Sequence, residues 1–246
     1  MTDRRARIDA KKAEIIRRVR EVRNARKTSQ TSRTSRRLPT SGGEETFTNA
    51  TFGSTQAIGD NNCYGFAVDK YRDSGNDKLQ PGQLSSTTQG ADDLTRCDLL
   101  AKRTLADLAT MPGGGYAVDA GAKCKRGYYK VMSFVDPGND YHWYRQMGNM
   151  IVHAPGGKTV PQLAAEMGVA ESQIDAASTT PAKCERIAVW DSGLWAHKRG
   201  LEELTTRDAS GRFISDPRDA DRKYPGLNYK DFCGAYCINS GFGVGA

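Results

Sequence analysis

The first part of the chain carries apolar residues at helical spacing. Within residues 3–27, Ile8, Ile15 and Val22 recur every seven positions. This spacing predicts a helix with a single narrow apolar stripe, and basic side chains occupy the rest of its circumference. The segment that follows, up to residue 46, is rich in Ser, Thr, Arg and Gly without periodicity, which predicts a linker.

From residue 47 onward the pattern predicts helices first and strands afterwards. Residues 92–109 have leucines on or near one face, as in an amphipathic helix, and NNCYGFAVD predicts a shorter helix. Residues 128–136 and 140–147 read as two strands of a hairpin. ERIAVW and GLWAHK are further strand candidates. Helices followed by an antiparallel sheet are typical of an α+β domain.

Composition and charge divide the chain in the same place. It has 246 residues, 37% hydrophobic and 26% charged, as expected for a globular protein. Residues 1–40 carry 14 basic and 4 acidic side chains, although the net charge of the whole chain is only +7. The basic excess therefore belongs to an arm over 1–46, and the domain expected over 47–246 is slightly acidic.

The basic arm is a candidate contact surface. The expected partners are nucleic acid, an anionic lipid surface or an acidic protein such as a subunit of a larger assembly, and a solvated helix and tail is the alternative. The side chains expected to make these contacts are Arg4, Arg5, Arg7, Lys11, Lys12, Arg17, Arg18, Arg20, Arg36 and Arg37. The sequence contains neither a membrane-spanning run nor a recognisable secretory signal. We therefore expect a protein that is intracellular in the producing cell or associated with a virion.

The residues that could carry chemistry are few. Cys63 lies at the expected start of a helix, where free N–H groups and the helix dipole favour a thiolate. Of the three histidines, His142 and His197 lie in aromatic-rich segments expected as strands. A thiol nucleophile needs an imidazole to take its proton and a third polar group to orient that imidazole. These residue types alone do not establish a catalytic site, because isolated Cys and His residues are usually structural.

An ordered series of motifs is more specific. NNCYGFAVD is followed by LQPGQ, DYHWYRQ, LWAHKRG, SDPRDADR and FCGAYC. From about Asn61 to Ile238 the chain resembles a group of bacterial and phage proteins that is in turn similar to papain-like cell-wall amidases of the NlpC and CHAP type. The resemblance implies a papain-like fold with Cys63 as nucleophile, His142 as base and His197 as orienting group.

The same resemblance implies an activity. Tyr64 and the backbone N–H of Cys63 are the candidates for an oxyanion hole. The implied reaction is hydrolysis of an amide in peptidoglycan or a polypeptide, and it requires no cofactor and no metal. The alternative belongs to another class: a non-catalytic structural protein of a virion, whose basic arm binds partner subunits or nucleic acid.

One stretch departs from the group. HWYRQ and Trp-x-His usually form one hairpin, but here residues 148–192 separate them. This stretch resembles a LysM module, in which two paired strands enclose two helices and which binds glycans containing N-acetylglucosamine. Such a unit has adjacent ends and fits at a hairpin tip; a plain helical hairpin is the other interpretation. His153, in the expected first strand of the insert, is an alternative third residue.

Cysteine usage gives weaker signals. Cys233 and Cys237 have the spacing of half a zinc site, but no second Cys/His pair matches them, so we expect no metal. The other cysteines apart from Cys63 are Cys97, Cys124 and Cys184. Without an export signal disulfides are not the default expectation, although the even count of six permits them.

Overall fold

The computed structural model describes residues 37–48, 52, 55–72, 78–87, 93–154, 158–175 and 185–241. The chain divides into two units, 1–36 and 37–246, and all described residues belong to the second. The helix expected over residues 3–27 lies outside the described residues. So do all the expected contact residues of the arm except Arg37.

The described unit has an α+β fold with few helices and a mainly antiparallel sheet, as the sequence pattern predicts. The helical elements are α2 (Thr55–Asp60), α3 (Cys63–Ala67), α4 (Cys97–Thr110), α5 (Val160–Met167) and the 3-10 turn η1 (Glu171–Gln173). The strands are β1 (Gly115–Val118), β2 (Tyr128–Asp136), β3 (Asp140–Gln146), β4 (Met150–Ala154), β5 (Glu185–Val189), β6 (Trp195–Lys198), β7 (Leu204–Thr205), β8 (Lys223–Tyr224), β9 (Leu227–Asn228) and β10 (Asp231–Asn239).

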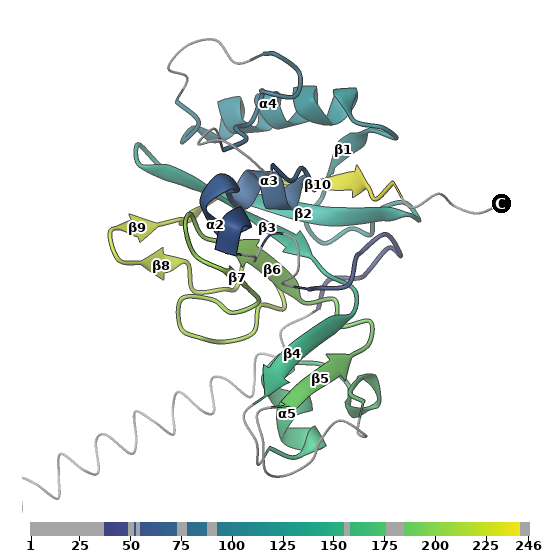
Figure 1. Ribbon diagram of the computed structural model, residues 1–246. Helices are drawn as coiled ribbons and strands as arrows, with labels where there is room; N and C mark the ends of the chain where they lie inside the picture. The colour runs from purple at the N-terminus through teal and green to yellow at the C-terminus, as the bar shows by residue number, and fades with distance from the viewer. Residues whose placement is uncertain are drawn as a thin grey trace, which may run out of the picture. The chain divides into compact units, whose positions relative to one another are not determined.

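Six strands form the central sheet in the order β1-β10-β2-β3-β6-β7, and each neighbouring pair is antiparallel (Figure 1). β2 and β3 form the expected hairpin, in register from Val131 opposite Arg145 to Asp136 opposite Asp140. Gly138 has a φ of 76° in the turn, a conformation that glycine adopts without a steric penalty. β10 lies between β1 and β2, so the sheet unites segments that are distant in sequence.

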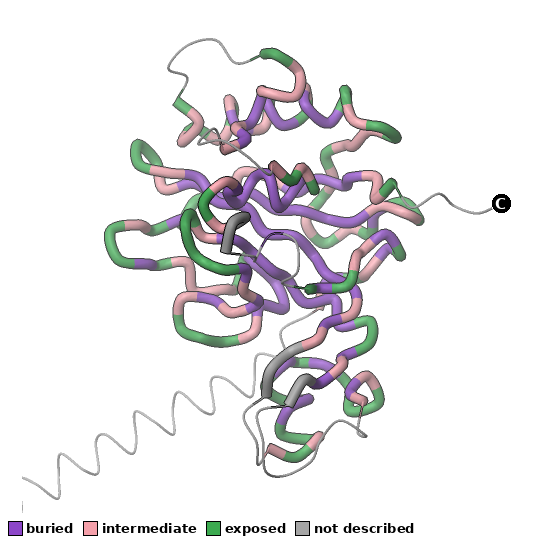
Figure 2. The backbone as a smooth tube through the Cα atoms, viewed as in Figure 1, coloured by how far each residue is buried: buried purple, intermediate pink, exposed green. Residues whose placement is uncertain are grey.

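The two faces of the sheet are both buried but are covered differently (Figure 2). Because side chains alternate along a strand, Tyr141 and Trp143 of β3 pack with the cluster beneath α3 and α4. We call this side the helix face. Tyr144 packs on the opposite side with Ile214 and Tyr229 from the segment between β7 and β10. We call that side the loop face.

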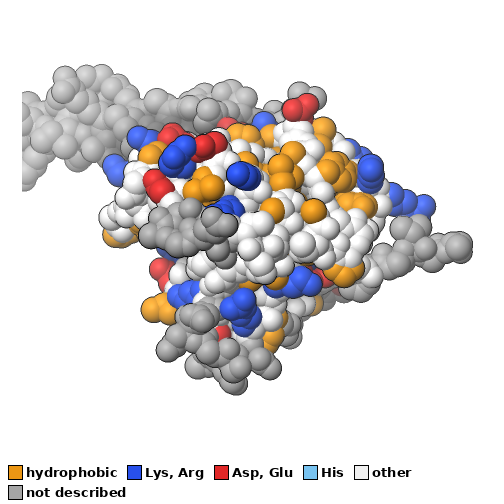
Figure 3. Space-filling model, turned by 90° about the horizontal axis from the view of Figure 1, so that it is seen from above, with side chains coloured by type: hydrophobic (Ala, Val, Ile, Leu, Met, Phe, Trp, Pro, Cys, Tyr) orange, Lys and Arg blue, Asp and Glu red, His pale blue; other side chains and the backbone are white. Residues whose placement is uncertain are grey.

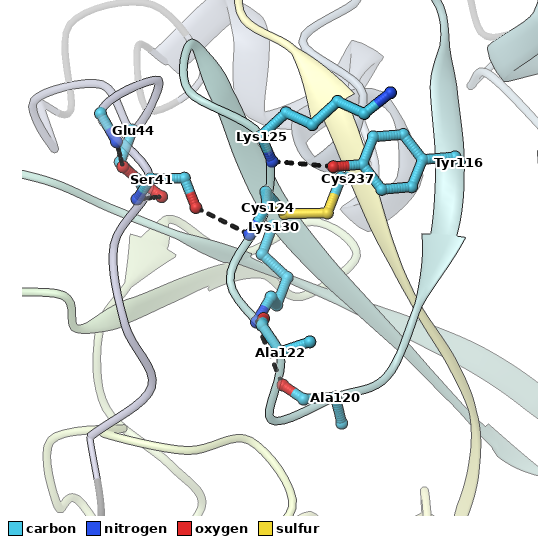
Figure 4. Close-up of a disulfide and its surroundings, with 10 residues drawn as sticks. Ser41, Glu44, Tyr116, Ala120, Ala122, Cys124, Lys125, Lys130 and Cys237 are labelled. Carbon is cyan, nitrogen blue, oxygen red and sulfur yellow. Dashed lines mark hydrogen bonds between the residues drawn. A yellow bond between two sulfur atoms is a disulfide. The ribbon is translucent and has the colours of Figure 1, made fainter.

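Two disulfides attach β10 to other parts of the unit. Cys97 of α4 is bonded to Cys233, and Cys124 is bonded to Cys237 (Figure 4). The backbone N–H of Cys124 also donates to the Ser41 hydroxyl oxygen at 3.0 Å. The expectation against disulfides is therefore wrong for these four cysteines, and Cys233 and Cys237 are bonded to different partners. Cys184 lies outside the described residues.

The domain begins earlier than the expected residue 47. Leu38 is buried in the loop-face cluster, so residues 37–46 are part of the fold and not a linker. Gly43 passes so close to Gly127 that a Cβ at residue 43 would lie 2.5 Å from the carbonyl carbon of Gly127. The sequence does not predict these contacts or the burial of Leu38, because a Ser/Thr/Gly-rich segment has no hydrophobic periodicity.

The insert over residues 148–192 has the expected position. β4 and β5 pair with each other, while β3 and β6 resume pairing at Arg145 opposite Ala196 and at Gln146 opposite Trp195. α5 begins with a capping box, in which Thr159 and Gln162 satisfy each other's backbone N–H groups. Among the described residues, only the short 3-10 turn η1 stands where a second helix was expected. The paired strands fit an insertion at a hairpin tip, and the LysM resemblance stays a prediction.

The surface gives two further facts. On the face seen from the side of α4, Lys and Arg side chains are scattered among hydrophobic and uncharged groups (Figure 3). Among the helices of the described residues, none is both long and apolar enough to span a membrane.

Candidate functional site

Cys63 is the first residue of α3, as the sequence predicts. The preceding residue, Asn62, is the N-cap, and its side-chain oxygen accepts from the backbone N–H of Gly65 at 2.9 Å. Its side-chain nitrogen donates to the carbonyl oxygen of Leu79 at 2.8 Å. Asn62 thereby caps the start of α3 at Cys63 and also holds segment 78–87 next to that helix start.

The Cys63 sulfur lies against the backbone of β3. Sγ is 3.9 Å from the carbonyl oxygen of Tyr141, and the backbone N–H of Trp143 also interacts with it. β3 pairs with β6 only at Arg145 and Gln146, so this edge of β3 is open to the thiol. The sulfur therefore contacts the strand immediately before and after His142.

The imidazoles of His142 and His197 are in direct contact. Nε2 of His142 lies 2.7 Å from Nδ1 of His197, and Nε2 of His197 lies 2.9 Å from the carbonyl oxygen of Arg207. A carbonyl oxygen only accepts, so a neutral His197 carries its proton on Nε2 and accepts at Nδ1. His142 must then donate from Nε2. This leaves Nδ1 of His142, the ring nitrogen nearer its backbone, free to accept a proton.

The histidine pair is enclosed by aromatic rings on the loop face. Tyr229 stacks on His142 with centroids 4.9 Å apart, and Tyr144 meets the same ring edge-on at 5.0 Å. His142 is 2% exposed and His197 is fully buried. Burial lowers the pKa of His142 well below its usual value and that of His197 to about 4. Both rings are therefore neutral at pH 7, which the tautomer assignment requires.

The thiol is also neutral in this conformation. Cys63 is 6% exposed, and burial together with the nearby carboxylate of Asp140 raises its pKa to about 12. The N–H groups of Trp143 and Tyr64 lower the pKa, but by less than burial raises it. The expected thiolate is therefore wrong for this conformation, because desolvation outweighs the N–H groups at the helix start.

The expected constellation is assembled in part. His142 and His197 meet as predicted, and Cys63 lies beside the strand that carries His142. Among the described residues, the structure has no hydrogen bond between the Cys63 sulfur and either imidazole. His153 lies in β4, which pairs with β5 outside the central sheet, so the structure favours His197 as the partner of His142.

Tyr64 has a structural role for its side chain. The buried hydroxyl donates to Oδ2 of Asp107 at 2.7 Å, and the same carboxylate accepts from the backbone N–H groups of Gly82 and Ser85. The Tyr64 hydroxyl is thus occupied in the core, so any contribution of Tyr64 to an oxyanion hole would come from its backbone N–H. Backbone N–H groups at the start of α3 remain candidates for that role.

Sequence reasoning missed several neighbours of Cys63. The Tyr141 hydroxyl donates to the side-chain oxygen of Gln80 at 2.5 Å, which ties the LQPGQ motif to β3. Lys198 donates to the carbonyl oxygen of Ile58 at 2.9 Å, and its charge acts on Cys63. Burial lowers the pKa of Lys198 to about 8. The sequence could have pointed to these residues, because Gln80, Tyr141 and Lys198 lie within the motifs LQPGQ, DYHWYRQ and LWAHKRG.

Arg37 is used within the domain. Its guanidinium donates to the side-chain oxygen of Gln173 and to the carbonyl oxygen of Asp191, each at 2.7 Å. Both partners belong to the insert. Arg37 therefore has a structural role within the domain, and its contact with nucleic acid or a partner subunit stays a prediction.

Comparison of the chain with family models, with curated proteins and with solved structures found no match in any of the three. Function is therefore inferred from the residues and from the geometry described above.

Proposed function

We propose that the protein is a thiol-dependent amide hydrolase with a papain-like site, and that its substrate is peptidoglycan or a related polypeptide. The observation that carries the proposal is the hydrogen-bonded chain from the Arg207 carbonyl through His197 to His142. This chain leaves one acceptor nitrogen on His142, next to the backbone that the Cys63 sulfur contacts. The motif resemblance assigns the same three residues to a nucleophile, a base and an orienting group.

The proposed reaction has two steps. Nδ1 of His142 takes the thiol proton while Sγ of Cys63 attacks the amide carbonyl carbon, and His142 then gives that proton to the departing amine. A water molecule, deprotonated by His142, attacks the resulting thioester, releasing a carboxylic acid and restoring the thiol. His197 keeps the His142 ring in the reactive tautomer throughout. Because thiol and imidazole are neutral at rest, proton transfer accompanies attack rather than preceding it.

Two further features favour a cell-wall substrate and a place of action outside a reducing cytosol. The paired strands and helix of the insert suit the resemblance to a glycan-binding LysM module. Disulfides such as Cys97–Cys233 and Cys124–Cys237 persist in oxidising surroundings. Both features agree with a protein that is carried in a virion.

The test is digestion of purified peptidoglycan, with products identified by mass spectrometry. Cys63→Ala should lower product formation by about 10³-fold or more, because the nucleophile is lost. His197→Gln should lower it by roughly 10²-fold, whereas the matched variant His153→Gln should stay within about twofold of wild type. Equal product from wild type and Cys63→Ala would remove the thiol from the mechanism.

The burial of all three side chains favours a second candidate, a non-catalytic structural component of a virion. On this proposal Cys63 and the histidines only fill the space between α3, β3 and β6. A folded wild-type protein that forms no product from peptidoglycan or from a peptide library, and that co-assembles with virion subunits, would support it.

A further inference from the structure

A cavity of about 360 Å³ lies on the helix face between residues 45–48 and the end of α3. Its size falls within the range of small-ligand sites. Four aromatic residues form part of its wall: Phe47, Phe52, Phe66 and Tyr71. The ring of Phe52 meets Phe66 edge-on at 5.5 Å and Tyr71 edge-on at 5.7 Å.

The charges at this cavity do not cancel. The guanidinium of Arg145 is 1% exposed and is held between Oε2 of Glu45 at 2.9 Å and Oδ1 of Asp69 at 3.1 Å. Two carboxylates against one guanidinium leave one negative charge in excess. The carboxylates are the accessible partners, with 28% of the Glu45 side chain and 43% of the Asp69 side chain exposed. Burial raises the pKa of Glu45, and the nearby carboxylate of Asp69 raises it further, although Arg145 opposes both effects.

The backbone places one carboxylate at the cavity. Asp69 follows the end of α3 with a φ of 54°, in the left-handed region where glycine is usual after a helix. A residue with a side chain is disfavoured there by about 1 kcal/mol, and Asp is among the types that tolerate it best. The carboxylate of Asp69 pairs with Arg145 and lines the cavity together with the aromatic residues.

The cavity is near the proposed catalytic residues. Phe66 follows Cys63 by three residues on α3, which is a rise of about 4.5 Å along the helix. Arg145 follows His142 by three residues on β3, about 10 Å along the strand. The wall of the cavity thus includes residues of α3 and β3 that follow Cys63 and His142 by three positions each.

We propose that this cavity binds a primary ammonium group on an aliphatic stem, as in a lysine-type side chain of the peptide that the enzyme cleaves. The ammonium compensates the excess charge of Glu45 and Asp69, and the stem lies against the rings of Phe52 and Tyr71. As a substrate subsite the proposal rests on the proposed function, but ligand binding can be measured without catalysis.

The experiment titrates the full chain carrying Cys63→Ala with Nα-acetyl-lysine methylamide, followed by calorimetry or NMR shifts. The uncharged probe Nα-acetyl-norleucine methylamide should bind about tenfold more weakly or not at all. Asp69→Asn should weaken lysine-probe binding by about tenfold, whereas Asp119→Asn, at an exposed carboxylate outside the cavity, should not. Thr48→Trp should also abolish binding by filling the space while keeping every charge.

Two results would overturn the proposal: equal binding of the two probes, or equal affinities of Asp69→Asn and Asp119→Asn for the lysine probe. Binding that follows the expected pattern in a protein without hydrolytic activity would leave the ammonium site intact and reject only the proposed function. Hydrolysis without preference for lysine-type substrates would support the proposed function and reject the ammonium site.

Discussion

The two faces of β3 have different surroundings, although the residues that form them alternate along one short strand. On the helix face, Tyr141 and Trp143 join an apolar cluster that packs beneath α3 and α4. On the loop face, His142 is surrounded by tyrosines and bonded to His197. The alternation of a strand thus separates the apolar cluster of the helix face, which includes Cys63, from the histidine pair on the loop face. We infer that the helix face supplies most of the stability and also the Cys63 thiol, whereas the loop face supplies the histidine pair.

The largest expected effect tests the helix face. Trp143→Ala should lower the free energy of unfolding by about 3–5 kcal/mol, because it empties a fully buried site beside Tyr64. Trp190→Ala, at a residue that is 53% exposed, is the matched control and should cost less than about 1 kcal/mol. Urea unfolding followed by circular dichroism measures both. Similar losses of unfolding free energy from the two variants would show that packing on the helix face does not contribute more to stability than an exposed residue does.

The next effect tests the loop face through pH. A histidine whose pKa is lower in the folded state binds its proton preferentially when unfolded, so stability falls as pH falls from about 6.5 toward the folded pKa. For His197, with a folded pKa of about 4, the loss between pH 7 and pH 4 is about 3 kcal/mol, and His142 acts in the same direction. His197→Gln should flatten this dependence in urea titrations at the two pH values. An unchanged slope would contradict a neutral, buried pair.

The smallest effect tests the hydroxyl that anchors segment 78–87. Tyr64→Phe removes one donor to the buried carboxylate of Asp107 and should cost about 1–2 kcal/mol. Tyr128→Phe, whose exposed hydroxyl donates to the Gly113 carbonyl, should cost less than about 0.5 kcal/mol. Thermal unfolding can rank the two variants. Equal costs would mean that Asp107 is satisfied without Tyr64.

Local patterns predicted the parts of the fold that depend on neighbours in sequence. The hairpin of β2 and β3 and the start of α3 at Cys63 follow from periodicity and capping. The self-paired strands of the insert were expected from the resemblance to a LysM module. The contact of His142 with His197 could be expected from the motif order together with an insert at the hairpin tip. The hairpin and the helix start need few contacts that are distant in sequence, whereas His142 and His197 are 55 residues apart.

Other features depend on long-range contacts that no local pattern encodes. The disulfide partners of Cys233 and Cys237 are more than a hundred residues away, and their pairing follows from the place of β10 in the sheet. The neutral state of Cys63 depends on how completely α3 and β3 exclude water. Residue type and helix position suggested a thiolate because they carry no information about desolvation.

The position of β10 also bears on how the protein is made. β1 and β2 do not pair with each other, and each is bonded to β10. When β1 through β9 have left the ribosome, the sheet therefore still lacks the strand that joins β1 to β2. Folding of this half of the sheet must wait until β10 has emerged, and only then can an oxidant close the bonds to Cys97 and Cys124. A nascent chain halted before Asp231 should remain sensitive to protease however long it is given to mature.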